Sequence, residues 1–177
     1  MSKQLWVMDP AHSEVTFKVR HMMITNVTGT FENSTGSMHA DSADFSDAEI
    51  SFEAEVASVN TRNGQRDEHL RTNDFFDAVT YPKLTFQSSK MEKAGDNDYV
   101  LHGEIMIRGV KKQITLQVAY KGIVVDLWGL TRAGFEMSGS VLRADFGLHW
   151  NASTDDGSIV LSDEVKLLMN VQMIKQV

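Results

Sequence analysis

Three adjacent polar residues, Asp67, Glu68 and His69, form the run in this chain that most suggests acid–base or metal chemistry. A zinc helix of the His-Glu-x-x-His type needs a second histidine one turn along, so that two imidazoles face the same ion. That histidine is missing here, and the sequence contains no His-x-His or His-x-x-x-His pair. The sequence therefore predicts no metal site.

Three further histidines, His12, His21 and His149, lie in separate segments of the chain. Folding can bring them together, with Asp9 or Asp145 as a carboxylate partner. Single histidines in separate loops also serve as turn and capping residues. The sequence does not decide between one joint site and three unrelated structural roles.

Motifs for nucleophilic catalysis and for nucleotide cofactors are absent from the sequence. Neither Ser13 nor Ser138 stands in a Gly-x-Ser-x-Gly elbow, which argues against an α/β-hydrolase nucleophile. No Gly-x-Gly-x-x-Gly or Walker pattern occurs, and the chain has no cysteine. We therefore expect no cofactor, no disulfide and no cysteine nucleophile.

The length and composition of the sequence favour one globular domain that spans residues 1–177. Its net charge of -7 offers no basic footprint for nucleic acid or for an anionic membrane. No run of eighteen apolar residues occurs, so we expect no transmembrane segment. The first residues lack an apolar leader, which predicts a cytoplasmic protein.

The segments that must position these side chains mostly follow the alternating pattern of β-strands. Val15, Phe17 and Val19 lie on one face of the first such segment, and polar residues lie on the other. His21 continues the apolar face at the strand end. Its ring is therefore either a hydrogen-bonded core group or a contact for the polar part of a ligand.

Similar alternation predicts seven further strands, near residues 29–38, 50–56, 83–91, 99–108, 112–121, 135–146 and 164–175. The connections between strands are predicted as turns at 41–47, 94–98 and 108–111, a helical turn at 22–25 and an irregular glycine-rich loop at 122–134. Eight strands with mostly short connections indicate an antiparallel barrel or sandwich rather than an α/β fold.

A short helical insertion interrupts this pattern between the third and fourth predicted strands, at residues 58–77. Asn63 can cap a helix, and Asp67 then lies in its first turns, where negative charge is favoured. Asp67 and Arg71 are four residues apart and are predicted to pair on the surface. The large apolar groups of the insertion are expected to anchor it as a lid or plug on the strands, and they are Leu70, Phe75 and Phe76.

The predicted barrel interior is rich in methionine and phenylalanine. The chain has ten methionines, of which Met137, Met169 and Met173 fall on predicted inward faces. Flexible thioethers suit a pocket that adapts to an irregular apolar guest, and they equally fill gaps in a solid core. An eight-stranded barrel has room for either outcome.

Nine different short motifs are spread along the chain from one end to the other. They are Asp-Pro-Ala-His-Ser at 9–13, Val-Thr-Phe at 15–17, Gly-Thr-Phe at 29–31, Thr-Arg-Asn-Gly-Gln-Arg-Asp-Glu-His-Leu at 61–70, Asp-Phe-Phe-Asp at 74–77, Tyr-Pro at 81–82, Gly-Glu-Ile-Met-Ile-Arg-Gly at 103–109, Arg-Ala-Asp-Phe-Gly at 143–147 and Ser-Asp-Glu-Val at 162–165. With these motifs in this order, the whole chain resembles the YceI-like family of bacterial polyisoprenoid-binding proteins.

The resemblance implies a lipocalin-like, eight-stranded antiparallel β-barrel whose pore holds a polyisoprenoid or a similar amphiphilic lipid, such as an isoprenoid quinone or its precursor. It implies a carrier or reservoir rather than an enzyme, and it raises the prospect of a homodimer. Many members of that family are periplasmic or secreted. This sequence differs from them in that its first residues lack an apolar leader.

Residues on the predicted inward faces are the expected contacts for a lipid tail. They are Val15, Phe17, Val19, Phe52, Val56, Phe86, Ile105, Ile107, Leu116, Val118, Met137 and Met169. The candidates for head-group contacts are His21, Arg62, Arg66 and Arg143, because guanidinium forks match phosphate oxygens. Each arginine also has a structural interpretation, either tying loop carbonyls together or, for Arg143, pairing with Asp145 or Asp67.

An enzyme remains the alternative from a different functional class. In that hypothesis His21 or His69 acts as a general acid or base on a small apolar substrate at the mouth of the pore. Extraction of a stoichiometric lipid from the purified protein would favour carriage instead.

Overall fold

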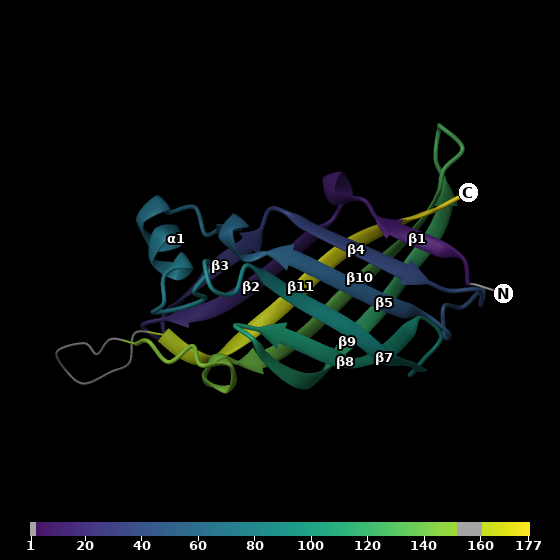
Figure 1. Ribbon diagram of the computed structural model, residues 1–177. Helices are drawn as coiled ribbons and strands as arrows, with labels where there is room; N and C mark the ends of the chain where they lie inside the picture. Colours follow the sequence, from purple (N-terminus) through teal and green to yellow (C-terminus); the bar gives the residue numbers. More distant parts are fainter. Residues whose placement is uncertain (1–2, 152–160) are drawn as a thin grey trace.

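The chain folds into an antiparallel β-barrel with one helix at one end, in a computed structural model that describes residues 3–151 and 161–177 (Figure 1). The helix is α1 (Gly64–Arg71). The strands are β1 (Leu5–Met8), β2 (Glu14–His21), β3 (Thr25–Phe31), β4 (Ser34–His39), β5 (Glu49–Glu55), β6 (Val59–Asn60), β7 (Lys83–Lys93), β8 (Asp98–Ile107), β9 (Val110–Val125), β10 (Thr131–Leu142) and β11 (Leu161–Lys175). Three 3-10 turns complete the elements, η1 (Pro10–His12), η2 (Val56–Ser58) and η3 (Arg143–Phe146).

Eight strands close a ring in the order β1-β4-β5-β7-β8-β9-β10-β11, because β1 pairs with both β4 and β11. β1 and β2 both pair with β11, so they act as one long strand broken at η1. β3 and β4 are likewise two parts of the next long strand, because β3 pairs with β2 and β4 pairs with β1. With β5 and β6 counted together, the barrel has the eight strands predicted, and α1 falls between the third and fourth as expected.

The ring of paired strands is continuous at one end of the barrel. At the other end it is interrupted at β6. Toward the interrupted end, β2, β3 and β6 continue the sheet beyond β11, and the sheet order ends at β6, which pairs with β3. The insertion between β6 and β7 lies at this end, where Figure 1 shows α1 on the left. A long hairpin of β9 and β10 projects from the opposite end, beside the two termini.

Alternation sets which residues face the interior, and glycines allow large rings to lie flat across it. Phe17 pairs with Gly29 on the neighbouring strand, and a Cβ built on Gly29 would stand 2.3 Å from the tip of the Phe17 ring. A Cβ built on Gly103 would likewise stand 2.4 Å from the tip of the Phe86 ring. A side chain at either glycine would therefore force an aromatic ring out of its place.

Several local predictions were wrong in detail. Residues 122–134 are not an irregular loop, because β9 runs to Val125 and β10 starts at Thr131 around a tight turn. A bulge opposite Gly134 and Phe135, beside Gly122 with a φ of 123°, shifts the register of the two strands by one residue. Residues 22–24 form a hairpin turn rather than a helical one, with positive φ at Met22 and Met23.

The hairpin at residues 108–111 is confirmed as a tight connection. Arg108 and Gly109 both have positive φ, which is the geometry of a two-residue turn matched to strand twist. Among the residues that the structure describes, no helix is long and apolar enough to cross a bilayer.

Candidate binding cavity

The barrel interior contains a narrow apolar compartment of about 120 Å³. Its wall is formed by residues from every strand except β6 and exposes almost no polar surface. Methionines contribute a large share, with Met8, Met137, Met169 and Met173 all on the wall. The interior is therefore hollow rather than solidly filled, and its lining is easily rearranged.

A second compartment of about 470 Å³ adjoins the first toward the α1 end of the barrel. The two compartments adjoin each other, because five residues line both, and they are Phe17, Phe31, Leu84, Ile107 and Leu167. The outer compartment is bounded by α1, the loop that follows it, the ends of β2 and β11, and η3 with the residues after it. We call its outer boundary the mouth.

The end of the barrel opposite the mouth is plugged by aromatic rings. Phe45 packs against Trp6, Tyr120 and Phe135 with ring centroids 5.2–5.4 Å apart. Phe45 is only 2% exposed and adopts a left-handed backbone with a φ of 60°. Because such a backbone is unfavourable for a bulky residue, the packing of its ring must hold it there.

The insertion is held over the mouth by its own hydrogen bonds. Asn63 caps α1 by accepting from the backbone N–H of Arg66 at 3.1 Å, as predicted. Asp67 is buried and accepts from both the backbone N–H and the hydroxyl of Thr61, at 2.9 and 2.6 Å. The predicted surface pair of Asp67 with Arg71 is therefore wrong. Arg71 instead donates to the carbonyl of Ala57 at 2.9 Å.

The apolar side chains of the insertion face the outer compartment. Leu70, Phe75 and Phe76 all line it, and the Phe76 ring contacts Phe31 of β3 at a centroid distance of 5.7 Å. The expectation that these three residues seat the insertion on the strands agrees with this placement.

Of the head-group candidates, His21 and Arg66 lie between the outer compartment and a neighbouring surface groove. Arg66 donates from Nε to the Thr61 hydroxyl and from Nη2 to the Thr61 carbonyl, both at 2.7 Å. Arg66 therefore binds a loop carbonyl, which is the structural role expected of it if it does not bind a head group. Arg62 is exposed and lines the groove, not the compartment.

Arg143 lines the outer compartment but its guanidinium is turned to backbone carbonyls. It is 6% exposed, and its Nη1 donates to the carbonyls of Leu148 and Trp150 at 2.9 and 2.7 Å. Its Nε donates to the carbonyl of Ser162 at 2.8 Å. The suggested pairing with Asp145 or Asp67 is wrong. Burial lowers the pKa of Arg143, an effect that nearby Asp163 opposes.

His69 also lines the outer compartment, and its Nε2 lies 2.7 Å from a carboxylate oxygen of Asp74. Its ring contacts Phe75 and Trp150 edge to face, at centroid distances of 5.0 and 4.8 Å. This arrangement fixes the ring between two aromatic neighbours.

The predicted joint site of His12, His21 and His149 does not form. His12 Nδ1 lies 2.7 Å from Asp9, at the opposite end of β2 from His21, and His149 is exposed. Among residues 3–151 and 161–177, no group of three His, Asp or Glu side chains is arranged to hold a metal ion.

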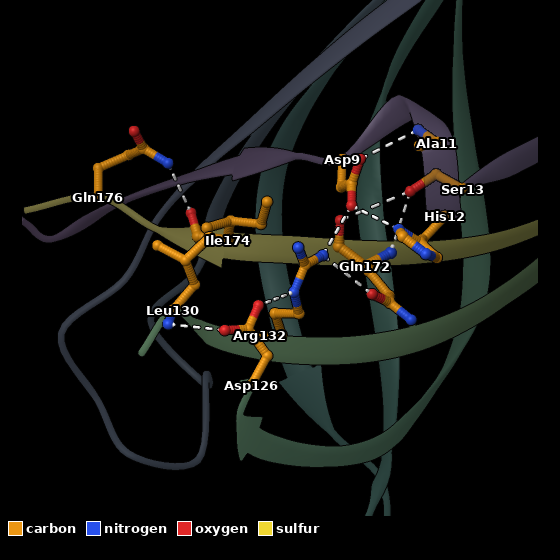
Figure 2. A network of polar contacts seen from close by, with 10 residues as sticks. All are labelled: Asp9, Ala11, His12, Ser13, Asp126, Leu130, Arg132, Gln172, Ile174 and Gln176. Atoms are coloured by element: carbon orange, nitrogen blue, oxygen red, sulfur yellow. Dashed lines mark hydrogen bonds and ion pairs between the residues drawn. The ribbon is translucent and has the colours of Figure 1, made fainter. Parts of the chain in front are cut away.

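The pair of His12 and Asp9 belongs to a polar network on the side of the barrel near the β9–β10 hairpin (Figure 2). Arg132 bridges Asp9 and Asp126, at 2.6 and 2.8 Å. The hydrogen bond from Arg132, with that from His12, lowers the pKa of Asp9 to about 2. Sequence analysis had suggested a His12–Asp9 contact but not its arginine partner.

Ten of the twelve predicted tail contacts line the two compartments, while Val56 and Val118 do not. Val56 is buried in η2, and Val118 is buried on β9, where it pairs with Tyr99 of β8 and Met137 of β10. The sequence list missed wall residues contributed by other strands, among them Met8, Phe31, Leu84, Leu101, Val165 and Leu167. Their alternation was visible in the sequence for β11 and β8, but not for β1.

A family model described as the YceI-like domain matches residues 6–173 of this sequence. The chain belongs to the YceI-like family. Protein YceI from Escherichia coli strain UMN026 is 34% identical to it over 165 residues, covering 93% of this chain and 83% of that protein.

Two solved structures share the fold over almost the whole chain. BcnA of Burkholderia cenocepacia superposes with a TM-score of 0.81 at 24% identity, covering 93% of this chain and 98% of that one. A polyisoprenoid binding domain from Saccharophagus degradans, implicated in plant cell wall breakdown, gives a TM-score of 0.72 at 17% identity, covering 98% and 100%. These two likenesses establish the architecture of the barrel.

Proposed function

We propose that the protein binds the hydrocarbon chain of a polyisoprenoid or similar amphiphilic lipid inside the barrel, and so sequesters or transports it. The observation that carries this proposal is the pair of adjoining apolar compartments in the barrel, which has aromatic rings plugging one end and polar side chains bordering the mouth at the other. The polyisoprenoid-binding domain that shares the fold supports the same conclusion.

An apolar guest gains enough from such a cavity to be retained. Each methylene that leaves water contributes about 0.8 kcal/mol, so fifteen carbons give on the order of 10 kcal/mol before association costs. A prenyl tail has no hydrogen-bonding groups, and the inner compartment offers almost none in return. The match therefore lies in apolarity and shape, with polar selection left to the mouth.

The size of the cavity constrains how the guest lies. Ligand pockets usually hold about 300–1,000 Å³, a range that the outer compartment of about 470 Å³ reaches and the inner one of about 120 Å³ does not. We infer that the bulk of the chain occupies the outer compartment and its end enters the inner one. A longer chain requires the methionine side chains of the inner wall to move aside.

His21 and Arg66 are the residues best placed to meet a polar head group. Both border the outer compartment and the adjoining groove, and His21 makes no side-chain hydrogen bond to any residue that the structure describes. Arg143 is a positioning residue instead, because its donors hold the backbone carbonyls that shape the mouth. A head group such as a pyrophosphate or a quinone ring would lie between α1 and the end of β2.

We further propose that the protein acts as a binding protein without a resident cofactor. The enzyme alternative is supported by one observation, the 2.7 Å contact of His69 with Asp74 at the mouth. If His69 were an acid or base, His69→Ala would abolish turnover of a substrate that the parent converts. Homodimer formation stays a prediction, since a single chain does not test it.

Organic extraction of the purified protein followed by mass spectrometry tests the proposed function directly. We expect one isoprenoid or related lipid per protein chain. Protein that is recovered free of lipid, and that takes up neither prenyl alcohols nor isoprenoid quinones, would contradict the proposal.

Two neighbouring residues of β11 give a matched pair of variants for chain length. Met169 lines the inner compartment, whereas Leu168 lies on the opposite face of the same strand and is 37% exposed. Met169→Trp fills the inner compartment, so long prenyl chains should bind at least about tenfold more weakly while short ones still bind. Leu168→Trp should leave both unchanged. Equal uptake of long chains by the two variants would show that the tail does not reach the inner compartment.

A further inference from the structure

The tip of the β9–β10 hairpin is covered with exposed apolar side chains on all sides. We call this segment the apolar finger, and its exposed residues are Ile123, Val124, Val125, Leu127, Trp128 and Leu130. Leu127 is 95% exposed and Trp128 is 79% exposed. Because successive residues of a strand point to opposite faces, the adjacent exposed residues Val124 and Val125 make both faces of the finger apolar.

Several polar groups of the finger are paired with one another. One carboxylate oxygen of Asp126 accepts from the backbone N–H groups of Trp128 and Leu130, both at 2.9 Å. The other accepts from Arg132 at 2.8 Å, and the Asp126 backbone N–H donates to the Leu130 carbonyl at 2.9 Å. The two side chains are only 13% and 16% exposed. These bonds satisfy the Asp126 carboxylate and four backbone N–H groups of the turn, those of Asp126, Trp128, Gly129 and Leu130. The cost of moving the turn out of water is therefore lower than for an unpaired loop.

The shape of the finger fits a bilayer better than a protein partner or a second copy of the chain. An exposed aromatic side chain offers ~200 Å² and the five aliphatic ones roughly half that each, so the finger presents on the order of 700 Å². A partner that lies against one face covers ~350 Å², well below the ~800 Å² per partner of a standard interface. A bilayer surrounds an inserted segment and covers both faces and the tip.

We propose that the apolar finger docks the protein on a lipid bilayer by inserting Leu127 and Trp128 among the acyl chains. The finger lies at the end of the barrel opposite α1 (Figure 1). In this orientation the mouth of the cavity faces away from the bilayer that holds the protein. The proposal is independent of what the cavity binds.

The charge of the chain determines which bilayers the finger can enter. A net charge of -7 is repelled by anionic head groups, so the attraction comes from burial of apolar surface. Binding to phosphatidylcholine vesicles should therefore need no anionic lipid, and added salt should not weaken it.

Vesicle flotation with the full-length protein and phosphatidylcholine vesicles tests the proposal. The parent should float with the vesicles, and Leu127→Ser/Trp128→Ser should lower the partition coefficient by at least about tenfold. Trp128→Phe should still float. With brominated lipid, Trp emission should be quenched in the parent and not in Trp128→Phe, because Trp6 is only 5% exposed and Trp150 borders the distant mouth.

Two control variants separate the finger from other exposed apolar groups. Val79 is 95% exposed but isolated, and Val79→Ser should float like the parent. Met23 and Ile24 are exposed on the β2–β3 turn beside the mouth, and Met23→Ser/Ile24→Ser should also float.

Four results would overturn the proposal. A parent protein that does not float, or a finger variant that floats as well as the parent, excludes docking by this segment. Loss of flotation in Met23→Ser/Ile24→Ser alone would place docking at the mouth. Sedimentation that shows a dimeric parent, a monomeric finger variant and no vesicle binding by either would make the finger a contact between copies.

Discussion

The two ends of the barrel use aromatic side chains in opposite ways. At the closed end, Phe45 fills the ring of strands and contacts three other aromatic rings within 5.2–5.4 Å. At the mouth, Phe75, His69 and Trp150 also touch one another, yet together they border a cavity of about 470 Å³. The same residue types thus make a plug in one place and a lining in the other.

The difference comes from how the backbone is covered at each end. The strands pair completely around the closed end, so a loop between β4 and β5 can place Phe45 in the middle of the ring. At the mouth, the sheet continues past the ring to β6, and the insertion covers it. Asp67 accepts hydrogen bonds from Thr61 within the insertion, and Arg71 donates to the carbonyl of Ala57. A plug therefore depends on packing, whereas a cover depends on a few polar contacts that can open locally.

The largest expected effect is the loss of the plug. Phe45→Ala leaves a void among three rings and should lower the free energy of unfolding by about 3–5 kcal/mol. Phe75→Ala removes a ring that already borders a cavity and should cost roughly half as much. Urea denaturation of the two variants measures the contrast. Equal losses would mean that the closed end is no better packed than the mouth.

A smaller effect is expected from detaching α1. Asp67→Ala leaves the buried N–H and hydroxyl of Thr61 without their acceptor, which should cost about 1–3 kcal/mol. Hydrogen exchange should then rise in α1 and stay unchanged in the strands of the closed end. The matched control is Glu68→Ala, because Glu68 is exposed on the same helix. Faster exchange at the closed end in Asp67→Ala would show that the two ends are not independent.

The smallest effect on stability is expected when the pH is lowered. The hydrogen bond from Arg132 lowers the pKa of Asp9 to about 2, so the charged carboxylate stabilises the fold above its ordinary pKa of 3.8. That contribution should be lost as the pH falls from about 4 toward 2. Asp9→Asn should therefore show a smaller loss of stability over this interval than the parent, measured by urea denaturation at several pH values. An identical loss would assign the acid sensitivity to other carboxylates, such as Asp47 and Asp126, whose pKa values are also lowered.

Alternation of apolar and polar residues predicted the barrel and most of the cavity wall. It succeeded because strand phase alone decides which side chains point inward, as Phe17, Ile105 and Met169 show. It failed at Val56, because a 3-10 turn replaces the strand there. The family resemblance supplied the closed barrel, which alternation alone left open.

The features that could not be predicted all depend on contacts between distant segments. The plug residue Phe45 lies in a stretch rich in Ser and Asp that reads as a turn, and no local signal sends its ring inward. Arg143 binds backbone carbonyls, which any sequence provides, so its acceptors carry no signature. The apolar finger was read as an irregular loop, because glycines at 122, 129 and 134 obscured the strands.

The absence of a side chain at Gly29 has a consequence for selectivity. The Phe17 ring occupies the space where a Cβ would stand, and the same ring lines both compartments at their junction. A single methyl group added at Gly29 on β3 would shift that ring and so change the shape of both compartments where they adjoin. Guest preference in this barrel can thus be retuned by a residue that never touches the guest.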